Sequence, residues 1–531
     1  MLNINKISDR FSGNFAKKLF VYLCVSIVLA PLLLNFTAFT HIDNDIWNHL
    51  ISENILWQLC KNSLILCFSV ALLSLVLGVS LGAIVAFFDF PARKYFEWLF
   101  IMPLSIPAYV FAFIYVGAFE YSSPINSFFH QYFSFDLNPP KDALYFTAPV
   151  LALAFYPYVY LYSKNAFQRG MRKPLENARS LGLNPIQAFF RCLLPLARPA
   201  IAGALLLVIM ESLADFGAVS IFNYDTFTTA IYKTWFSLQS INGAAQLSSA
   251  LSIFAILLIY LDFQKQNRKS FASKSLVSKD QRKRFQISKF WRIMFFVYAS
   301  IIILISFVFP MLQLLYWAAH HLQNIDYRYL HFLSQSAIIA TVAATICVGL
   351  SFLLVLIQVR SQNTKHKFLI RLSTLGYALP GSILAVGVYS LFAKFHLTHL
   401  AFTALITGLC IRFLSVSFNQ LQGARLQYSD RLSEAAQSLG KPVTQRLGLL
   451  HWPLLKNTLL TAFLLVFVDV AKEMPITLMT RPFGWSPLSV RIYEMTAEGE
   501  WQKAALPAVF LVLLSCLPIL FFIFYDRKKS T

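Results

Sequence analysis

The chain has 531 residues, of which 57% are hydrophobic and only 13% are charged. Soluble domains carry about 25% charged and about 45–50% apolar residues, so a soluble fold of this length would lack the polar side chains to cover its surface. Several apolar runs also reach the roughly 20 residues that a helix needs to cross a bilayer. The composition excludes an ordinary soluble protein and indicates a polytopic membrane protein.

The net charge of +21 comes from 45 Lys and Arg against 24 Asp and Glu. In a soluble protein this balance would suggest nucleic-acid binding. In a membrane protein it follows from the retention of basic residues on the cytoplasmic side of spanning helices. We therefore expect the lipid bilayer, and no nucleic acid, as a partner, with the N- and C-termini both in the cytoplasm.

Apolar periodicity predicts an all-α fold of about twelve transmembrane helices. The first six cover approximately 20–40, 62–88, 98–119, 144–163, 200–222 and 246–262. The second six cover approximately 291–318, 336–358, 371–393, 401–420, 458–480 and 504–525. The basic stretch 263–290 reads as a cytoplasmic linker between a first half, 1–262, and a second half, 291–531.

An internal repeat relates the two halves. The segment Leu104-Ser-Ile-Pro107-Ala recurs as Tyr377-Ala-Leu-Pro380-Gly, 273 positions later. Further along, Glu176-Asn-Ala-Arg-Ser-Leu-Gly182 recurs as Glu434-Ala-Ala-Gln-Ser-Leu-Gly440, 258 positions later. The smaller offset places about 15 extra residues in the first half, in the predicted outer loop 120–143. We therefore predict two parallel repeats of six helices each.

The second motif predicts a short helix–turn–helix elbow in each half, within the loops at about 164–199 and 421–457. The residues before Gly182 suit a helix, and Gly182 suits its left-handed end. Asn184-Pro185 reads as an N-cap followed by proline at the first helical position, whereas Pro442 repeats this start without a good cap. The second helix should stop or bend at Pro195, and likewise at Pro453.

The pattern E-x-A-x-x-x-G with a late proline resembles the cytoplasmic "EAA" loop of binding-protein-dependent ABC importer permeases. The resemblance covers nearly the whole chain and implies a type I permease fold in the bacterial inner membrane. It also implies that the elbows dock on two copies of a cytoplasmic ATPase. Asn177 departs from the family's usual Ala, and a purely structural connector is the alternative reading. The coupling residues would be Glu176, Ala178, Gly182, Pro195, Glu434, Ala435, Ala436, Gly440 and Pro453.

The chain shows no nucleotide site of its own. A P-loop requires G-x-x-x-x-G-K-[ST], but the sole Gly-Lys pair, Gly440-Lys441, is followed by Pro442 and has Ala435 in place of the first glycine. We therefore expect neither enzyme activity nor a cofactor in this chain, with ATP and Mg held by the partner ATPase.

Ionisable residues inside spans point to a transport path, because one at a helix centre costs about 2.5–3.5 kcal/mol. Glu211 and Asp215 lie in the fifth predicted span, and Asp469 and Glu473 recur 258 positions later, next to Lys472. A spacing of four puts each acidic pair on one helical face. We predict that these faces line the path. A structural pair, with Lys472 neutralising an acid, is the alternative.

The same segments resemble those of fused ferric-iron permeases. Ala214-Asp-Phe-Gly-Ala-Val and Tyr224-Asp-Thr-Phe-Thr-Thr229 resemble their first half, and Lys472-Glu-Met-Pro475 with Thr480-Arg-Pro-Phe-Gly484 resembles their second. The resemblance implies ferric iron as cargo, a periplasmic binding protein that delivers it, and ATP-driven alternating access. The alternatives are a thiamine or aminophosphonate permease, an ion-coupled secondary transporter, and a membrane-embedded enzyme or scaffold.

A metal site in this chain is not predicted with confidence. The spacing of His396 and His399 would let both reach one ion, but no third ligand accompanies them. The donors of the predicted outer loops are His320, His321, Asp326, His396 and His399.

Overall fold

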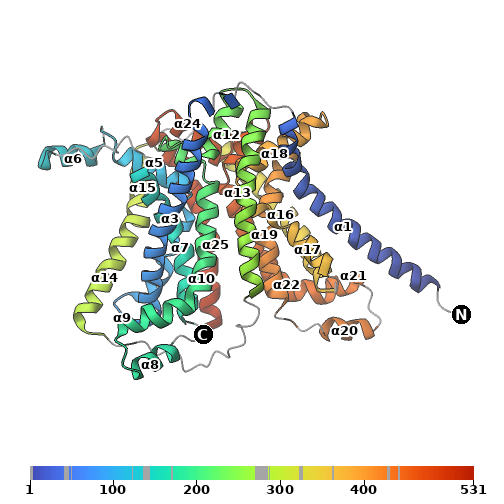
Figure 1. The fold of residues 1–531 in the computed structure, drawn as a ribbon, viewed down its shortest axis with the longest axis horizontal. Coiled ribbons are helices and arrows are strands. Elements are labelled where there is room, and N and C mark those ends of the chain that lie inside the picture. Colours follow the sequence, from blue (N-terminus) through green and yellow to red (C-terminus); the bar gives the residue numbers. More distant parts are fainter. Residues whose placement is uncertain are drawn as a thin grey trace. The chain divides into compact units, whose positions relative to one another are not determined.

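The structure is a computed structural model, and helices form nearly all of the part of the chain that it describes (Figure 1). The structure describes residues 4–40, 47–48, 51–121, 123–134, 144–168, 172–268, 285, 287–321, 327–360, 364–426, 428, 431–439 and 443–530. Within these ranges the β pairing consists of one isolated bridge, between Phe88 and Phe285. The predicted all-α fold is confirmed.

Eight helices among the described residues are long and apolar enough to cross a membrane, or up to ten if each of two bent helix pairs is one span. Two shorter apolar helices, Ile241–Leu257 and Trp501–Cys516, lie where the sixth and twelfth spans are predicted. The exact number of twelve stays a prediction. The eight are Lys18–Thr40, Ile55–Phe87, Leu144–Gln168, Pro185–Ala214, Lys289–His320, Arg328–Gln358, Thr398–Arg425 and Gly448–Lys472.

The chain divides into two compact units, and each unit takes segments from both sequence halves. Unit 1 comprises Met1–Asp43, Thr234–Ser252 and Tyr327–Val490, and unit 2 comprises Asn44–Lys233, Ile253–Asp326 and Arg491–Thr531. The first spanning helix of each half thus belongs with the other half's helices. The predicted boundaries at 262 and 291 describe the sequence repeat, which is a different division from the compact units.

Unit 2 is built on three packed helices, α3 (Ile55–Phe87), α7 (Leu144–Gln168) and α10 (Leu194–Ala214). Gly78 and Gly82 let α7 approach α3, since a Cβ at Gly78 would lie 2.5 Å from the Cβ of Val159. Small residues four apart are a common device of close helix packing in membranes. The other helices of this unit are α4 (Arg93–Leu99), η2 (Met102–Ser105), α5 (Ala108–Ala118), α6 (Pro124–Phe133), α8 (Arg172–Ser180), α9 (Pro185–Ala188), η3 (Phe189–Leu193), α11 (Gly217–Ile221), α14 (Lys289–Ile303), η6 (Leu304–Val308) and α15 (Phe309–His320).

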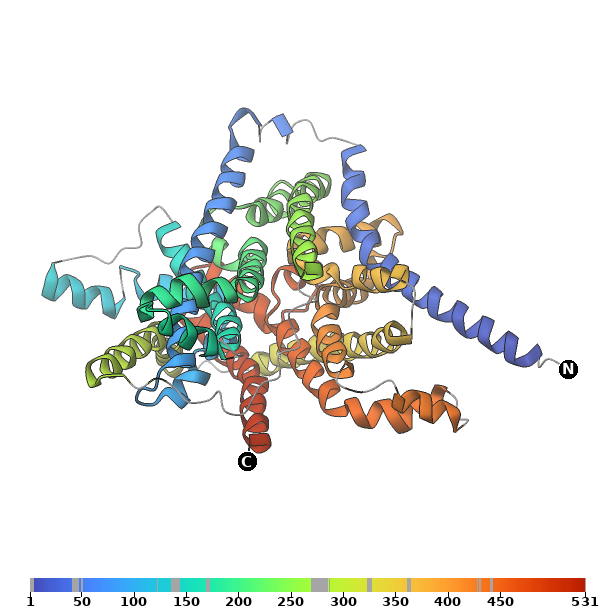
Figure 2. The same ribbon diagram turned by 60° about the horizontal axis from the view of Figure 1, so that its bottom comes forward.

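Unit 1 repeats this three-helix core with α16 (Tyr327–Arg360), α19 (Ala401–Arg425) and α22 (Trp452–Lys472), coloured yellow to orange in Figure 2. Helix α1 (Ile4–Thr37) packs on α18 (Gly381–Lys394), where the Asn35 amide donates to the Ile383 carbonyl at 3.1 Å. The other helices of this unit are η1 (Ala38–Thr40), α17 (Thr364–Leu372), η8 (Leu375–Ala378), η9 (Thr398–Leu400), α20 (Arg431–Ser438), α21 (Val443–Arg446), η10 (Leu447–His451) and α23 (Pro475–Thr480).

Four further helices complete the described chain. They are α12 (Phe227–Phe236), α13 (Ile241–Arg268), α24 (Leu488–Ala497) and α25 (Trp501–Ser530). The C-terminal helix α25 packs on α15 and α5 within unit 2.

Candidate functional site: two elbows and two broken spans

Both halves break their third span at the proline of the first repeated motif. In unit 2 the helix pair Arg93–Ser105 and Ala108–Ala118 is bent by 90°, and in unit 1 the pair Phe368–Ala378 and Gly381–Lys394 is bent by 112°. Ile106 and Leu379, which precede the two prolines, have ψ angles of 119° and 135°. Proline imposes this extended conformation on the residue before it. The spans predicted at 98–119 and 371–393 are therefore not single straight helices; each is a pair of helices joined at a bend.

The fifth span of each half ends directly before an aligned acid. Helix α10 ends at Ala214 and α22 ends at Lys472, and the next residues, Asp215 and Glu473, have extended ψ angles of 129° and 124°. Because their φ angles of −66° and −69° are still helical, the prediction that each acidic pair shares one helical face stays a prediction. Glu211 and Asp469 lie within the spanning helices, whereas Asp215 and Glu473 lie at the breaks that follow.

Each of these two carboxylates caps the short helix after the break. One oxygen of Asp215 accepts from the amides of Ala218 and Val219 at 3.0 and 3.1 Å, in the first turn of α11. Glu473 accepts from the amides three and four residues further on at 2.9 and 3.1 Å, in the first turn of α23. A negative charge at a helix N-terminus is stabilised by the unpaired amides and the helix dipole. The repeated acids therefore mark a repeated backbone break.

Unit 1 adds a buried ion pair at its break. The Arg412 guanidinium on α19 donates to the Glu473 carboxylate at 3.2 Å, with side chains 11% and 2% exposed. Gly381, the first residue of α18, makes room for this pair. A Cβ there would overlap the Arg412 Nη1 atom and lie 2.7 Å from the Glu473 Oε1 atom. The second-half break is thus fastened to α18 and α19 together.

The sequence of the first half does not repeat the residues around this ion pair. Counted by the two repeat offsets, Ala154 stands at the place of Arg412 and Ala108 at the place of Gly381. Asp215 is half-buried, whereas Glu473 is buried. The repeat therefore preserves the backbone geometry of the break but not the aligned arginine and glycine.

The ion pair was not foreseen, although its signal was present as an arginine within a predicted span. The sequence alone favours Lys472 as the neutralising cation, because it is adjacent to Glu473. The structure identifies Arg412, on another helix, as a partner of Glu473. Glu211, Asp469 and Lys472 are half-buried, and their part in a transport path stays a prediction.

The first elbow has the local geometry that its sequence predicts. Gly182 follows α8 with a φ of 87°, and the next amide, of Leu183, donates to the Ala178 carbonyl at 3.2 Å. Asn184 then caps α9 in a capping box, in which its side chain accepts from the Gln187 amide at 2.7 Å. These bonds satisfy backbone groups that a helix end leaves unpaired.

Helical structure continues past both late prolines. In each half a five-residue π-helical turn, η3 or η10, comes just before Pro195 or Pro453, and the chain continues into α10 or α22. A π turn shifts the backbone hydrogen bonds by one residue, which accommodates the N–H that proline lacks. Of the predicted stop or bend, the stop is wrong, because Pro185–Ala214 is one uninterrupted apolar helix of 30 residues, and the bend stays a prediction.

Ala178 anchors the first elbow to its unit. It is buried in a cluster that also contains Phe87, Phe167 and Leu193. Glu176 is exposed, and the tip residue Leu181 is 84% exposed. The elbow thus holds a small apolar residue against the membrane helices and presents a large one to its surroundings.

The second elbow is described in part. Helix α20 contains Glu434, whose side chain lies outside the described residues, as does Gly440 entirely. Ala435 is exposed and Ala436 half-buried. Leu439, at the position aligned with Leu181, is 77% exposed. The two elbow tips therefore present the same apolar residue.

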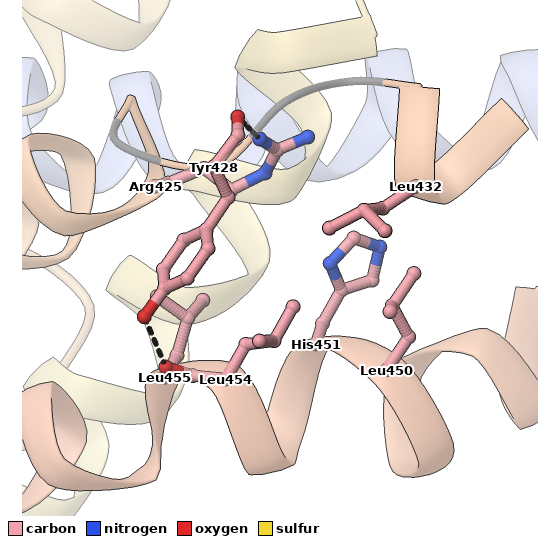
Figure 3. A pocket seen from close by; sticks show the side chains of 7 residues that line it. All are labelled: Arg425, Tyr428, Leu432, Leu450, His451, Leu454 and Leu455. Carbon is pink, nitrogen blue, oxygen red and sulfur yellow. Dashed lines mark hydrogen bonds between the residues drawn. The ribbon is translucent and has the colours of Figure 1, made fainter.

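A small pocket lies behind the second elbow (Figure 3). The Arg425 guanidinium at the end of α19 donates to the Tyr428 carbonyl at 3.1 Å, and the Tyr428 hydroxyl donates to the Leu454 carbonyl at 3.0 Å. His451 faces Leu432 of α20 across the pocket. These contacts tie the elbow to α19 and α22.

The described residues contain no group of three or more His, Cys, Asp or Glu side chains that could hold a metal ion. His320 Nδ1 lies 2.8 Å from the Tyr316 carbonyl oxygen, and Asp326 lies outside the described residues.

Comparison with known proteins finds similarity to transport permeases. Residues 78–267, which include the first elbow, match the family model described as "binding-protein-dependent transport system inner membrane component". The Fe(3+)-transport system permease protein FbpB 2 of Haemophilus influenzae is 27% identical, over 87% of this chain and 88% of that protein. The ferric transport system permease protein FbpB of Actinobacillus pleuropneumoniae is 23% identical, over 89% of this chain and 72% of its own length.

A shorter relative matches a single part of the chain. The molybdenum transport system permease protein ModB of Haemophilus influenzae is 26% identical over 206 residues, which are 37% of this chain and 85% of that protein.

Proposed function

Because this chain is a permease of the binding-protein-dependent transport family, similar to fused ferric permeases, we propose that it carries ferric iron across the inner membrane. A periplasmic binding protein delivers the iron, and two cytoplasmic ATPase subunits drive alternating access, one at each elbow. The chain's likeness to ferric permeases over most of its length supports the cargo. Acidic residues near both breaks suit a cationic solute.

One structural observation supports the coupling mechanism above all. The helix that starts at the first elbow continues through Pro195 to Ala214, where the Asp215 break begins. At about 1.5 Å per residue, the 21 residues of α10 alone extend about 32 Å, enough to cross a hydrocarbon core of about 30 Å. Helix α22 leads to Glu473 in the same way. Movement of an elbow would therefore reach the acid-capped break through one continuous helix.

The elbow tips are suited to docking on an ATPase. Leu181 and Leu439 occupy equivalent positions and leave most of their side chains uncovered. Apolar side chains that insert into a protein pocket are typical anchors of such interfaces. Both elbows adjoin the basic loops that the positive-inside rule places in the cytoplasm, as ATPase docking requires.

Uptake of radiolabelled ferric iron, presented on the binding protein, tests the proposal in cells that lack other ferric routes. Deletion of this chain should abolish uptake and the intact gene should restore it. Leu181→Asp and Leu439→Asp should each lower uptake and co-purification of the ATPase, while membrane insertion stays normal. The control variants Leu181→Met and Leu439→Met preserve an apolar tip and should behave as wild type.

Separate outcomes would refute the proposed cargo and the proposed docking sites. Ferric uptake that is unchanged by deletion would refute iron as the cargo, after which thiamine and aminophosphonates are the next solutes to test. Full ATPase binding and uptake in both aspartate variants would refute the elbow tips as docking sites. Transport without any ATPase would point to an ion-coupled secondary transporter.

A further inference from the structure

Helix α6 (Pro124–Phe133) has no counterpart in the second half of the repeat. It lies in the segment that carries the first half's extra residues, between α5 and α7. Both ribbon views show this helix, in cyan, extending away from α5 at the edge of unit 2 (Figures 1 and 2). The helix is fixed at its start by Ser123, whose hydroxyl accepts from the Asn126 amide at 3.1 Å.

The ten residues of α6 have two different faces. Four aromatic residues recur at the spacing of one helical side, while the residues between them are polar. The helix contains no Asp, Glu, Lys or Arg. The aromatic residues are Phe128, Phe129, Tyr132 and Phe133.

The aromatic face of α6 is largely uncovered by the protein. Phe128, Tyr132 and Phe133 are 52%, 65% and 66% exposed. The rings contact one another, with centroids 4.7 Å apart for Phe128 and Tyr132 and 5.6 Å apart for Phe129 and Phe133. Together they form a continuous aromatic surface that needs an apolar environment.

The neighbours of α6 place it at the level of the membrane surface. Helix α5 ends at Ala118, six residues before α6 starts, and α7 starts at Leu144. Tyr121 and Tyr145, at these two span ends, are both exposed. Tyrosines at the ends of spanning helices mark the interface between lipid tails and headgroups. The aromatic residues of α6 would thus lie at the same depth as Tyr121 and Tyr145, in the membrane interface.

We propose that α6 is an interfacial anchor, whose aromatic face lies in the headgroup and upper acyl region of the phospholipid bilayer. Amphipathic helices with aromatic residues on one side bind membranes in this way, with the apolar face buried by about 5–10 Å. The predicted orientation of the spans puts α6 in the outer leaflet. The lipid contact holds for any solute, so it is independent of the proposed cargo.

Tryptophan fluorescence in lipid nanodiscs tests the proposal on the full chain. Phe128→Trp places the probe on the aromatic face, and the matched control Ser127→Trp places it on the polar side of the same helix. Phospholipids brominated along one acyl chain quench nearby indoles. After subtraction of the nine native tryptophans, Phe128→Trp should be quenched strongly, most by bromines near the headgroup, and Ser127→Trp should not.

Equal quenching of the two variants, or none in Phe128→Trp, would overturn the proposal. So would a Phe128→Trp signal that is unaffected by brominated lipid but changes when the binding protein is added, because the face would then be a protein-docking surface. If Phe128→Trp does not fold, Tyr132→Trp places the probe on the same face. Strong quenching of Tyr132→Trp by brominated lipid would then support the proposal, and no quenching would overturn it.

Discussion

Removal of Arg412 should destabilise unit 1 by leaving a buried carboxylate without its cation. Breaking a buried ion pair on one side costs about 3–5 kcal/mol. Glu473 would keep the two backbone hydrogen bonds of α23 and one from the Thr477 hydroxyl at 3.2 Å. We therefore expect Arg412→Met to cost about 3 kcal/mol, the lower end of that range. For a unit of 150–250 residues, this loss lowers the unfolding midpoint by about 6–12 °C.

Thermal unfolding of the purified permease in detergent measures this effect. The double variant Arg412→Met with Glu473→Gln removes both charges, and it should recover most of the loss, because buried ion pairs are often replaceable by neutral groups. A wild-type midpoint for Arg412→Met would refute the reasoning. So would a double variant as unstable as the single one, since the cost would then come from lost packing and not from an uncompensated charge.

Three further variants and one control variant test the two breaks and the first elbow. Gly381→Ala should cost about 1–3 kcal/mol of stability by forcing the ion pair apart. The control is Gly203→Ala, because a Cβ there would meet nothing within 4 Å; it should be neutral or stabilising by up to about 1 kcal/mol. Thermal unfolding midpoints of the two variants measure the difference. Asn184→Ala should remove the cap of α9 and cost about 1 kcal/mol, seen as faster proteolysis of the elbow than in wild type. Asp215→Asn keeps a capping oxygen but loses the charge, so it should lower ferric uptake with little change in midpoint; unchanged uptake would exclude this charge from the path.

The features that sequence predicted correctly depend on neighbours in the chain. Gly182 and Asn184 act on amides within a few residues, and their rules hold wherever a helix ends. The apolar runs likewise identify membrane helices without knowledge of packing. The repeat added long-range information, since the two cores α3–α7–α10 and α16–α19–α22 pack alike.

The features that sequence missed depend on tertiary contacts or on competing local rules. The pairing of Arg412 with Glu473 joins residues on different helices, and periodicity carries no signal for it. The sequence predicts a stop or a bend at Pro195, because an α-helix has no place for its ring, but a π turn lets the helix continue. The breaks at Pro107 and Pro380 were readable from the proline rule alone, yet the strength of the apolar signal favoured straight spans.

The two halves therefore share one arrangement of helices, and the arginine that pairs with the carboxylate in unit 1 is not repeated in the sequence of the first half. In both, a continuous helix leads from an elbow to a carboxylate that caps a short helix. In unit 1 that carboxylate is buried and fastened by Arg412, with Gly381 beside it. In unit 2 the equivalent Asp215 is half-buried and caps α11. A movement of α23 away from α19 would therefore have to separate the buried ion pair of unit 1, which costs several kcal/mol when one charge is left uncompensated.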